Sequence, residues 1–228
     1  HQIPCVFVGH PLADNIPMTS DKNHAREMLN LPHSSKILSL MPGSRGGELS
    51  RLVGPFLATA ELLYIDAQKR GQLITFVVPM ISEKRAVQFR KLYKEIAPDL
   101  PLTIIVNDTQ NVMAASDCLL MASGTVALEA ALIKRPLVVC YKFNPLTYYL
   151  LKGFVKLKWF SLPNLLANKA LVPELLQGDV TANKIYPLVY ERLYQEQSAL
   201  NDEFINIHQT LKQNASEKAA MAVAKLLS

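Results

Sequence analysis

Short apolar segments alternate with helical segments along most of the chain, and this alternation limits the possible folds more than any other feature. The apolar segments, each expected to form a strand, cover residues 36–41, 74–78, 102–106, 118–121 and 137–141. The segments with apolar residues at helical spacing cover residues 51–70, 82–96, 110–115 and 125–133. Such an alternation predicts right-handed crossovers and a parallel sheet with helices on both faces. We therefore predict a Rossmann-like α/β domain with a doubly wound parallel sheet.

The start of the chain differs from this alternating part. Prolines are frequent among residues 1–20, which we expect to be a linker or domain edge with a short strand at residues 5–8. Residues 21–29 predict a helix, with Ser20 as its N-cap. The first residue is His1 rather than Met, so we expect the sequence to be a fragment.

The last third of the chain is expected to be helical. Residues 146–160 combine lysines with aromatic side chains, which suits a membrane interface, although a packed helix with snorkelling lysines has the same composition. A helix is predicted over residues 181–196, and two apolar stripes follow Leu200. We therefore expect a sheet domain over residues 21–180 and a helical C-terminal tail over residues 181–228.

The composition is that of a globular protein with a modest positive charge. Hydrophobic residues make up 50% of the chain, charged residues 19%, and the formal net charge is +5. This charge suits a phosphorylated ligand or an anionic membrane surface. There is no basic block with interleaved aromatic residues, so no nucleic acid partner is expected.

The histidines and cysteines predict no metal site. Their spacing matches no zinc motif, so we expect neither a metal ion nor another cofactor. Cys5, Cys118 and Cys140 lie in or beside apolar runs and are expected to be buried, reduced thiols of a cytosolic protein. No apolar run reaches the length of about 20 residues that spans a bilayer.

A glycine-rich segment, Met-Pro-Gly-Ser-Arg-Gly-Gly-Glu at residues 41–48, follows the first predicted strand. Its glycines allow a sharp turn and a close approach of the backbone to a ligand. Free N–H groups at a helix start, with Ser44 and Arg45 beside them, would bind an anion. Gly46 and Glu48 complete this candidate phosphate loop. The alternative is an ordinary strand-to-helix turn with a solvated arginine.

A second segment of the same kind, Ala-Ser-Gly-Thr-Val-Ala-Leu-Glu at residues 122–129, follows a later strand. Ser123 and Thr125 could donate to a phosphate, and Gly124 removes steric bulk. Glu129 shares a helix face with Thr125, where a carboxylate suits a vicinal diol such as a ribose. The alternative is an N-cap with a surface glutamate. Two such loops at the carboxyl ends of strands in one sheet support a ligand site more strongly than either does alone.

Two further segments carry weaker signals. Asn107 follows the strand at residues 102–106, where backbone groups could read a nucleobase edge, but Asp108 or Thr109 could equally be a helix N-cap. Asn164, in Ser-Leu-Pro-Asn, could bind a sugar or phosphate, or belong to a Pro-Asn turn. The sequence contains no convincing set of nucleophile, base and acid, so the catalytic residues are unknown.

Together these segments resemble the lipid-A-disaccharide synthase family, glycosyltransferases of the two-domain B fold. The resemblance covers nearly the whole chain, in order, through GHPLAD, PGSRGGELSRL, NDTQNVMAASDCLLMASGTVALEAALIKRPLVVCYK and SLPNLLANKALVPELLQ. The segments containing PGSR and SLPN are specific to this family. The segment containing ASGT is shared more loosely with other glycosyltransferases of the fold, including the peptidoglycan N-acetylglucosaminyltransferase.

The resemblance implies an inverting, metal-independent hexosyltransferase of lipid A biosynthesis in Gram-negative bacteria. Its donor would be UDP-2,3-diacylglucosamine and its acceptor 2,3-diacylglucosamine 1-phosphate, giving the β-1,6-linked disaccharide 1-phosphate and UDP. It also implies a peripheral protein on the cytoplasmic side of the inner membrane and a homodimer that exchanges C-terminal helices, which suits the tail at residues 181–228.

The resemblance also assigns roles to single residues. Ser44 and Arg45 match the diphosphate loop, and Glu129 matches the ribose-binding acid of the wider fold. The second phosphate loop and the functional asparagine of the family are matched by Ser123, Gly124, Thr125 and Asn164. The family's proposed catalytic base is an aspartate in the N-terminal acceptor domain, which no segment of this chain matches. The chain is therefore expected to bind the UDP donor but to be inactive alone.

Two other classes of function are compatible with the same residues. One is another UDP-sugar enzyme of this fold, an epimerase or an N-acetylglucosaminyltransferase. The other is a non-catalytic nucleotide-binding or membrane-docking module, which would bind UDP without any transfer.

Overall fold

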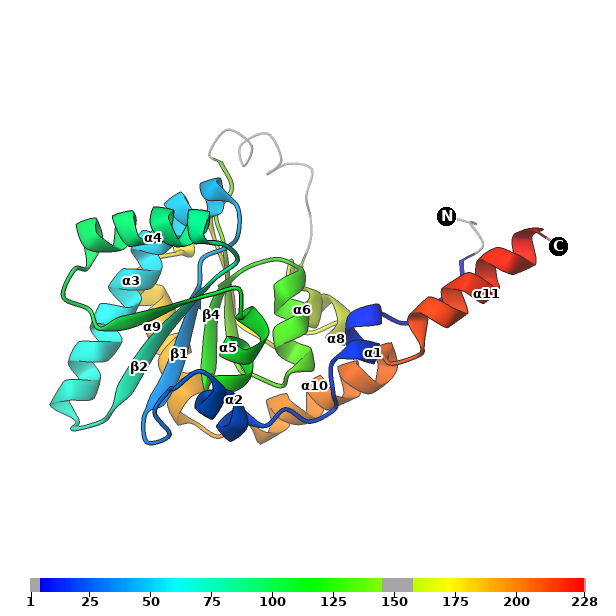
Figure 1. Ribbon diagram of the computed structural model, residues 1–228, viewed down its shortest axis with the longest axis horizontal. Helices are drawn as coiled ribbons and strands as arrows, with labels where there is room; N and C mark the ends of the chain where they lie inside the picture. Colours follow the sequence, from blue (N-terminus) through cyan, green and yellow to red (C-terminus); the bar gives the residue numbers. More distant parts are fainter. Residues whose placement is uncertain (1–4, 145–157, 228) are drawn as a thin grey trace.

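The computed structural model describes residues 5–144 and 158–227, and its centre is a six-stranded parallel sheet with the order β3-β2-β1-β4-β5-β6 (Figure 1). The strands are β1 (Lys36–Met41), β2 (Ile74–Met80), β3 (Leu102–Val106), β4 (Cys118–Ala122), β5 (Leu137–Tyr141) and β6 (Glu174–Leu176). The chain runs outward from β1 to β3 and then returns to place β4 on the other side of β1. The doubly wound, Rossmann-like sheet is confirmed, with its switch point between β1 and β4.

The helices follow the strands in the expected alternation. They are α1 (Pro11–Asn15), α2 (Lys22–Met28), α3 (Gly46–Lys69), α4 (Glu83–Ile96), α5 (Thr109–Ala115), α6 (Thr125–Leu132), α8 (Leu162–Ala167), α9 (Ala182–Tyr194), α10 (Ser198–Leu211) and α11 (Ala215–Leu227), with a 3₁₀ turn at Gln177–Asp179. Helix α3 begins at Gly46, earlier than the predicted residue 51, because Gly46, Gly47 and Glu48 carry no apolar signal.

The strand predictions were wrong in four places, of which the smallest is the end of β4 at Ala122 rather than at residue 121. Residues 5–8 form no strand. Strand β2 continues to Met80 although Pro79 lacks an N–H group, because the pairing of β2 with β1 ends at Val77 and only β3 pairs beyond it. Strand β6 was missed because a run of three residues carries no periodicity.

Two predictions about single side chains were also wrong. Asp21, not Ser20, is the N-cap of α2, since its carboxylate accepts hydrogen bonds from the N–H groups of Asn23 and His24. Ser20 instead donates to the carbonyl oxygen of Ile133. Cys5 is exposed, whereas Cys118 and Cys140 are buried as expected. Burial raises the pKa of Cys118 to about 12, so this thiol stays protonated.

Alternating side chains of the central strand face two different helix layers. Leu38 and Leu40 of β1 pack with the layer formed by α3, α4 and α9, whereas Met41 packs with α6, α8 and α10 on the opposite face. Ile37 packs with α2 and α5, next to that second layer. Figure 1 shows α3 and α9 on one side of the sheet and α5 and α6 on the other. The sheet therefore leaves its strand ends, rather than its faces, open to ligands.

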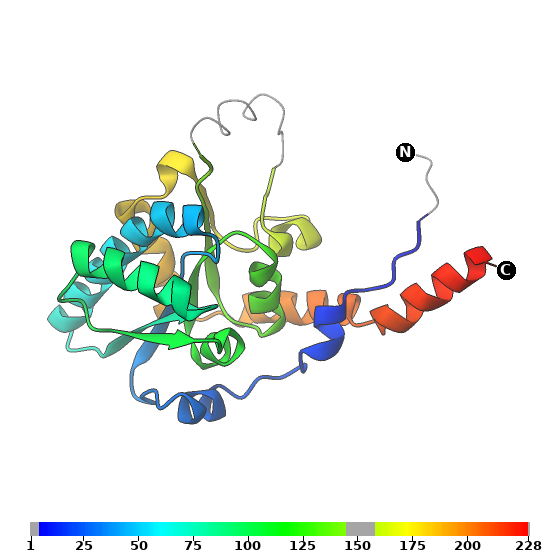
Figure 2. The same cartoon turned by 45° about the horizontal axis from the view of Figure 1, so that its top comes forward.

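The C-terminal helices do not form one unit. Helix α9 packs on the sheet and α10 on the opposite layer, while α11 extends away from both (Figures 1 and 2). Asp14 of α1 holds the start of α11 by accepting hydrogen bonds from the N–H groups of Gln213, Asn214 and Ala215. These bonds, led by that from Ala215, keep the pKa of Asp14 below its usual value. The predicted helix within residues 146–158 lies almost wholly outside the described residues.

A buried ion pair lies at the amino-terminal ends of β1 and β4. The guanidinium of Arg26 is 4% exposed and lies 2.6 Å from the carboxylate of Asp117, which directly precedes β4. Asp117 also accepts hydrogen bonds from Lys22 at 2.8 Å and from the N–H group of Ile37 at 2.7 Å. The pair therefore ties α2 to the starts of β1 and β4.

Candidate functional site

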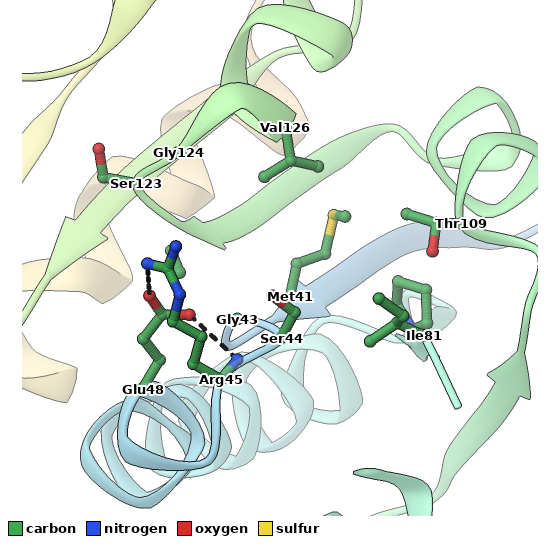
Figure 3. A pocket seen from close by; sticks show the side chains of 12 residues that line it. Met41, Gly43, Ser44, Arg45, Glu48, Ile81, Thr109, Ser123, Gly124 and Val126 are labelled. Carbon is green, nitrogen blue, oxygen red and sulfur yellow. Dashed lines mark hydrogen bonds and ion pairs between the residues drawn. The ribbon is translucent and has the colours of Figure 1, made fainter. Parts of the chain in front are cut away.

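A cavity of about 270 Å³ opens at the carboxyl ends of β1 and β4, at the switch point of the sheet (Figure 3). Open α/β sheets bind their ligands at this place, because the strand order leaves a crevice between two loops. Its walls are formed by the loops after β1, β2 and β4 and the starts of α5 and α6. The lining residues are Met41, Gly43, Ser44, Arg45, Glu48, Pro79, Ile81, Thr109, Ala122, Ser123, Gly124 and Val126.

The loop after β1 is held in shape by Gly43 and Glu48. Gly43 has φ +105°, and a Cβ atom there would lie 2.5 Å from Glu48 Oε2, so both the backbone and the space require glycine. Glu48 accepts hydrogen bonds from the N–H group and the guanidinium of Arg45, both at 3.3 Å (Figure 3). The guanidinium remains 83% exposed at the mouth of the cavity. The guanidinium is therefore accessible to an anion in the cavity.

The loop after β4 presents the start of a second helix to the same cavity. Ser123 is anchored because its N–H group donates to the carbonyl oxygen of Cys140 at 2.9 Å. Gly124 is extended, and a Cβ atom on it would meet nothing within 4 Å. Figure 3 shows Ser123 and Gly124 across the cavity from Arg45 and Glu48. Two helix N-termini thus converge on one space, and their free N–H groups favour a bound anion.

The structure brings together half of the residues that the sequence singled out. Ser44, Arg45, Glu48, Ser123 and Gly124 all line the cavity. Gly46 and Thr125 do not line the cavity. They are the first residues of α3 and α6, whose starts lie behind it. Both are next in the chain to lining residues, so their N–H groups belong to the first helical turns beside the cavity.

The predicted ribose-binding acid lies deeper in its helix. Glu129 is partly buried in α6 and does not line the cavity. Burial raises the pKa of its carboxyl group. Asn107, at the end of β3, is exposed with φ 61°, and its N–H group donates to the carbonyl oxygen of Met80. Neighbouring Thr109 is the residue of this segment that does line the cavity.

Asn164 lies away from the cavity and is 1% exposed. Its amide group donates to the carbonyl oxygen of Val172 and to Glu174, and its Oδ1 accepts from the N–H groups of Leu171 and Val172. Glu174 also accepts hydrogen bonds from Ser161. Asn164 thus ties the start of α8 to the strand β6 in this structure, with all its polar atoms already occupied.

Sequence reasoning missed the apolar side of the cavity. Met41, Ile81 and Val126 line it, and Figure 3 shows Met41 beside Ser44 and Val126 near Gly124. The only available signal was their position directly after a strand or at the start of a helix, which many apolar residues share. Thr109 could have been found, because it lies in the segment that already drew attention to Asn107.

The polar lining of the cavity suits an anion better than it suits proton transfer. Among the described residues that line it, Glu48 is the only carboxylate, and it is engaged with Arg45. No histidine or lysine of the described part lines it. Within the described ranges there is also no group of three or more His, Cys, Asp or Glu side chains placed to hold a metal ion. None of the helices in those ranges is both long and apolar enough to cross a membrane.

Solved structures show the same fold at low sequence identity. UDP-bound MnaA from S. aureus aligns with a TM-score of 0.60 and 16% identity, covering 96% of this chain and 54% of that protein. UDP-GlcNAc 2-epimerase from Neisseria meningitidis, bound to UDP-GlcNAc, aligns with a TM-score of 0.56 and 14% identity, covering 90% and 49%. These alignments support the Rossmann-like fold alone.

Sequence comparison identifies closer relatives. Lipid-A-disaccharide synthase from Colwellia psychrerythraea is 64% identical over 228 residues, which is all of this chain and 57% of the relative. The enzyme from Idiomarina loihiensis is 46% identical over 227 residues, covering 100% and 59%. The chain thus spans less than two thirds of these curated relatives. A family model described as lipid-A-disaccharide synthetase matches residues 1–226, and the chain therefore belongs to that family.

Proposed function

We propose that the chain is the donor-binding part of a lipid-A-disaccharide synthase. The complete protein would transfer 2,3-diacylglucosamine from UDP-2,3-diacylglucosamine to 2,3-diacylglucosamine 1-phosphate, releasing UDP and the β-1,6-linked disaccharide 1-phosphate. The observation that carries the proposal is the convergence of two helix N-termini and Arg45 on one cavity at the switch point of the sheet. Membership of the family supports it. The two solved structures described above support it as well, because those proteins of the same fold hold UDP or UDP-GlcNAc.

The chemistry of the transfer explains why such a cavity is needed. An inverting transfer requires stabilisation of the charge that develops on the leaving diphosphate and a base on the acceptor hydroxyl. We assign the first task to this cavity, where the first-turn N–H groups of Gly46 and Thr125 and the side chains of Ser44, Arg45 and Ser123 would surround the diphosphate. The described residues that line the cavity include no free carboxylate or imidazole. We therefore place the base in the part of the relatives that this chain does not span.

The remaining predicted residues receive supporting roles. Glu48 would hold Arg45 in position, and Gly124 would allow the diphosphate to approach the backbone. Glu129 would contact the ribose once the donor is bound. The segment at Asn107 would contact the nucleobase. Asn164 would act through the loop that it holds, since its own polar atoms are occupied.

We further propose the organisation expected from the family. Residues 1–20 would connect to the acceptor domain, and residues 21–180 would hold the donor. Of the C-terminal helices in residues 181–228, α9 and α10 pack on the sheet domain, so α11 would pack on the acceptor domain or exchange in a homodimer. The exposed course of α11 away from the sheet supports the last part. The protein would act at the cytoplasmic surface of the inner membrane, where its acylated substrates lie.

The proposal is tested by UDP binding to Arg45→Ala. We expect the dissociation constant to rise by about tenfold, which corresponds to about 1.4 kcal/mol. This is near the lower end for a charge-assisted hydrogen bond, because the Arg45 guanidinium is 83% exposed and partly screened by water. Calorimetry on the full-length protein and on the chain alone provides the measurement.

The matched control is Arg90→Ala, an exposed arginine on α4 that pairs with Glu83 at 3.2 Å. This variant should bind UDP as the wild type does. Equal affinities of the Arg45 and Arg90 variants would exclude the loop after β1 as the donor site. UDP binding by the full-length protein without any glycosyl transfer would favour a non-catalytic nucleotide-binding module instead.

A further inference from the structure

A second polar pocket lies at the other end of the central strands from the cavity lined by Ser44 and Ser123, which we call the nucleotide cavity. It has a volume of about 310 Å³ and lies at the amino ends of β1 and β4. Its charged lining residues are Lys22, Lys36, Asp117, Lys134, Arg135 and Arg192. Because the nucleotide cavity lies at the carboxyl ends of the same strands, roughly 20 Å of strand separate the two sites. The nucleotide cavity and this second pocket therefore cannot share one small ligand.

The cations of this pocket outnumber its carboxylates. Of the described residues that line it, only Asp117 is acidic, and it is already paired with Lys22 at 2.8 Å and with Arg26 at 2.6 Å. Arg192 lies 3.4 Å from Glu191, and its buried Nε atom has no hydrogen-bond partner among the described residues. The Arg192 Nη1 atom donates to Gln197 at 2.9 Å, so this guanidinium contributes positive charge beside the pocket while it is held by protein groups.

Lys134 occupies a position where the backbone favours glycine. Its φ is 60°, directly after α6, and its N–H group donates to the carbonyl oxygen of Ala131, while Arg135 donates to that of Ala130. This pattern is a Schellman motif, whose left-handed residue is usually glycine. A lysine there costs backbone energy but places an ammonium group at the pocket.

The positive charge around Lys134 is not neutralised by the described residues beside it. Burial, followed by the charges of Lys212 and Arg135, lowers the pKa of Lys134 to about 8. Its ammonium group forms one hydrogen bond with Nδ1 of His208 at 2.5 Å. An ammonium has three donors, so two remain for a ligand.

We propose that this second pocket binds a phosphate group of an anionic ligand, independently of the nucleotide cavity. The lysines provide the point-charge donors that phosphate oxygens accept. Arg135 adds positive charge while its guanidinium donates to the backbone carbonyl oxygens of Ala114, Ile133 and Lys134. The excess of cations and the strained Lys134 support this ligand class. The phosphate could belong to a soluble compound or to a lipid headgroup, and the experiment distinguishes these sources.

The test uses the full-length protein with the nucleotide cavity saturated by UDP. Inorganic pyrophosphate is titrated by calorimetry into the wild type and into the double variant Lys36→Gln/Lys134→Gly. Lys36 is exposed at the start of β1, and glycine suits φ 60°, so the variant should melt no earlier than the wild type. We expect its dissociation constant for pyrophosphate to rise by about tenfold or more.

The control is Lys91→Gln, which removes an exposed positive charge of α4 far from the pocket. It should bind pyrophosphate like the wild type, and UDP affinity should be unchanged in all variants. Absence of wild-type binding at millimolar pyrophosphate, or an equal loss in Lys91→Gln, would overturn the proposal. Co-sedimentation with phosphatidylglycerol vesicles, lost only in the double variant, would assign the phosphate to a lipid. Retained co-sedimentation alongside lost pyrophosphate binding would assign it to a soluble compound.

Discussion

Replacing Asp117 with alanine is expected to lower the free energy of unfolding by about 3–5 kcal/mol, the usual cost of breaking a buried ion pair by removing one partner. The Asp117 carboxylate is 10% exposed and the Arg26 guanidinium 4%, so the variant leaves a positive charge buried. Hydrogen bonds from Arg26 to the carbonyl oxygens of Ala115 and His33 remain and place the loss near the lower limit. Urea unfolding followed by circular dichroism measures it.

The control for this prediction is Asp179→Ala. Asp179 pairs with Lys184 at 2.5 Å, but both side chains are more than half exposed. Exposed pairs contribute little, so this variant should change the unfolding free energy by less than about 0.5 kcal/mol. A loss below about 1 kcal/mol in Asp117→Ala would show that Arg26 is satisfied by backbone carbonyls alone.

The same carboxylate has a defined pH dependence. Burial alone would raise the pKa of Asp117, but the hydrogen bonds from Lys22 and Ile37 and the charges of Lys22 and Arg26 together lower it below 3.8. A lowered pKa in the folded state means that the stabilisation is present above the unfolded value and is lost as the pH falls through the folded value. The stability difference between the wild type and Asp117→Asn should therefore shrink below about pH 4.

Gly43→Ala is expected to weaken UDP binding by about a hundredfold, or about 2.7 kcal/mol. The backbone at φ +105° disfavours any side chain, and the new Cβ would lie 2.5 Å from Glu48 Oε2 and 2.8 Å from Glu48 Cβ. Relief of this clash must move Glu48, which holds both the backbone and the guanidinium of Arg45. The anion would then lose the arginine and the helix start together. Calorimetry with UDP on the full-length protein gives the affinity.

Two other glycines separate the causes of this loss. Gly71 has φ +64°, and a Cβ atom added to it would meet nothing within 4 Å, so Gly71→Ala should reduce stability but keep UDP affinity. Gly124 has an extended backbone and equally open surroundings, so Gly124→Ala should keep stability and weaken UDP binding only by filling the cavity. UDP affinity of Gly43→Ala within about threefold of the wild type would place the nucleotide elsewhere.

Much of the local structure follows from patterns that lie within a few residues of one another. The apolar runs of β1, β3 and β5 have the bounds that their sequence predicts. For the inner strands β1 and β5, the reason is that strands buried on both faces are continuously apolar. The glycine-rich loop at Ser44 and Arg45 was recognisable because glycines between a predicted strand and a predicted helix are typical of a sharp turn that can bind an anion. Strand β6 could not be recognised, because a strand of three residues has no periodicity. The N-cap Asp21 could not be distinguished from Ser20, because both are polar residues adjacent in the chain.

The doubly wound sheet and the two loops that end its central strands could be predicted from local patterns in the chain. Which side chains those loops and strand ends bring together depends on the packing of the whole domain. Asn164 stands in a segment that suggests ligand binding, but Val172 and Glu174 occupy all its polar atoms together with Leu171. Lys134 stands at a helix end whose sequence suggests no ligand, but the fold places it with Arg192 in the lining of one pocket. The physical reason is that hydrogen bonding and charge balance depend on residues distant in sequence, which meet only when the strands pair.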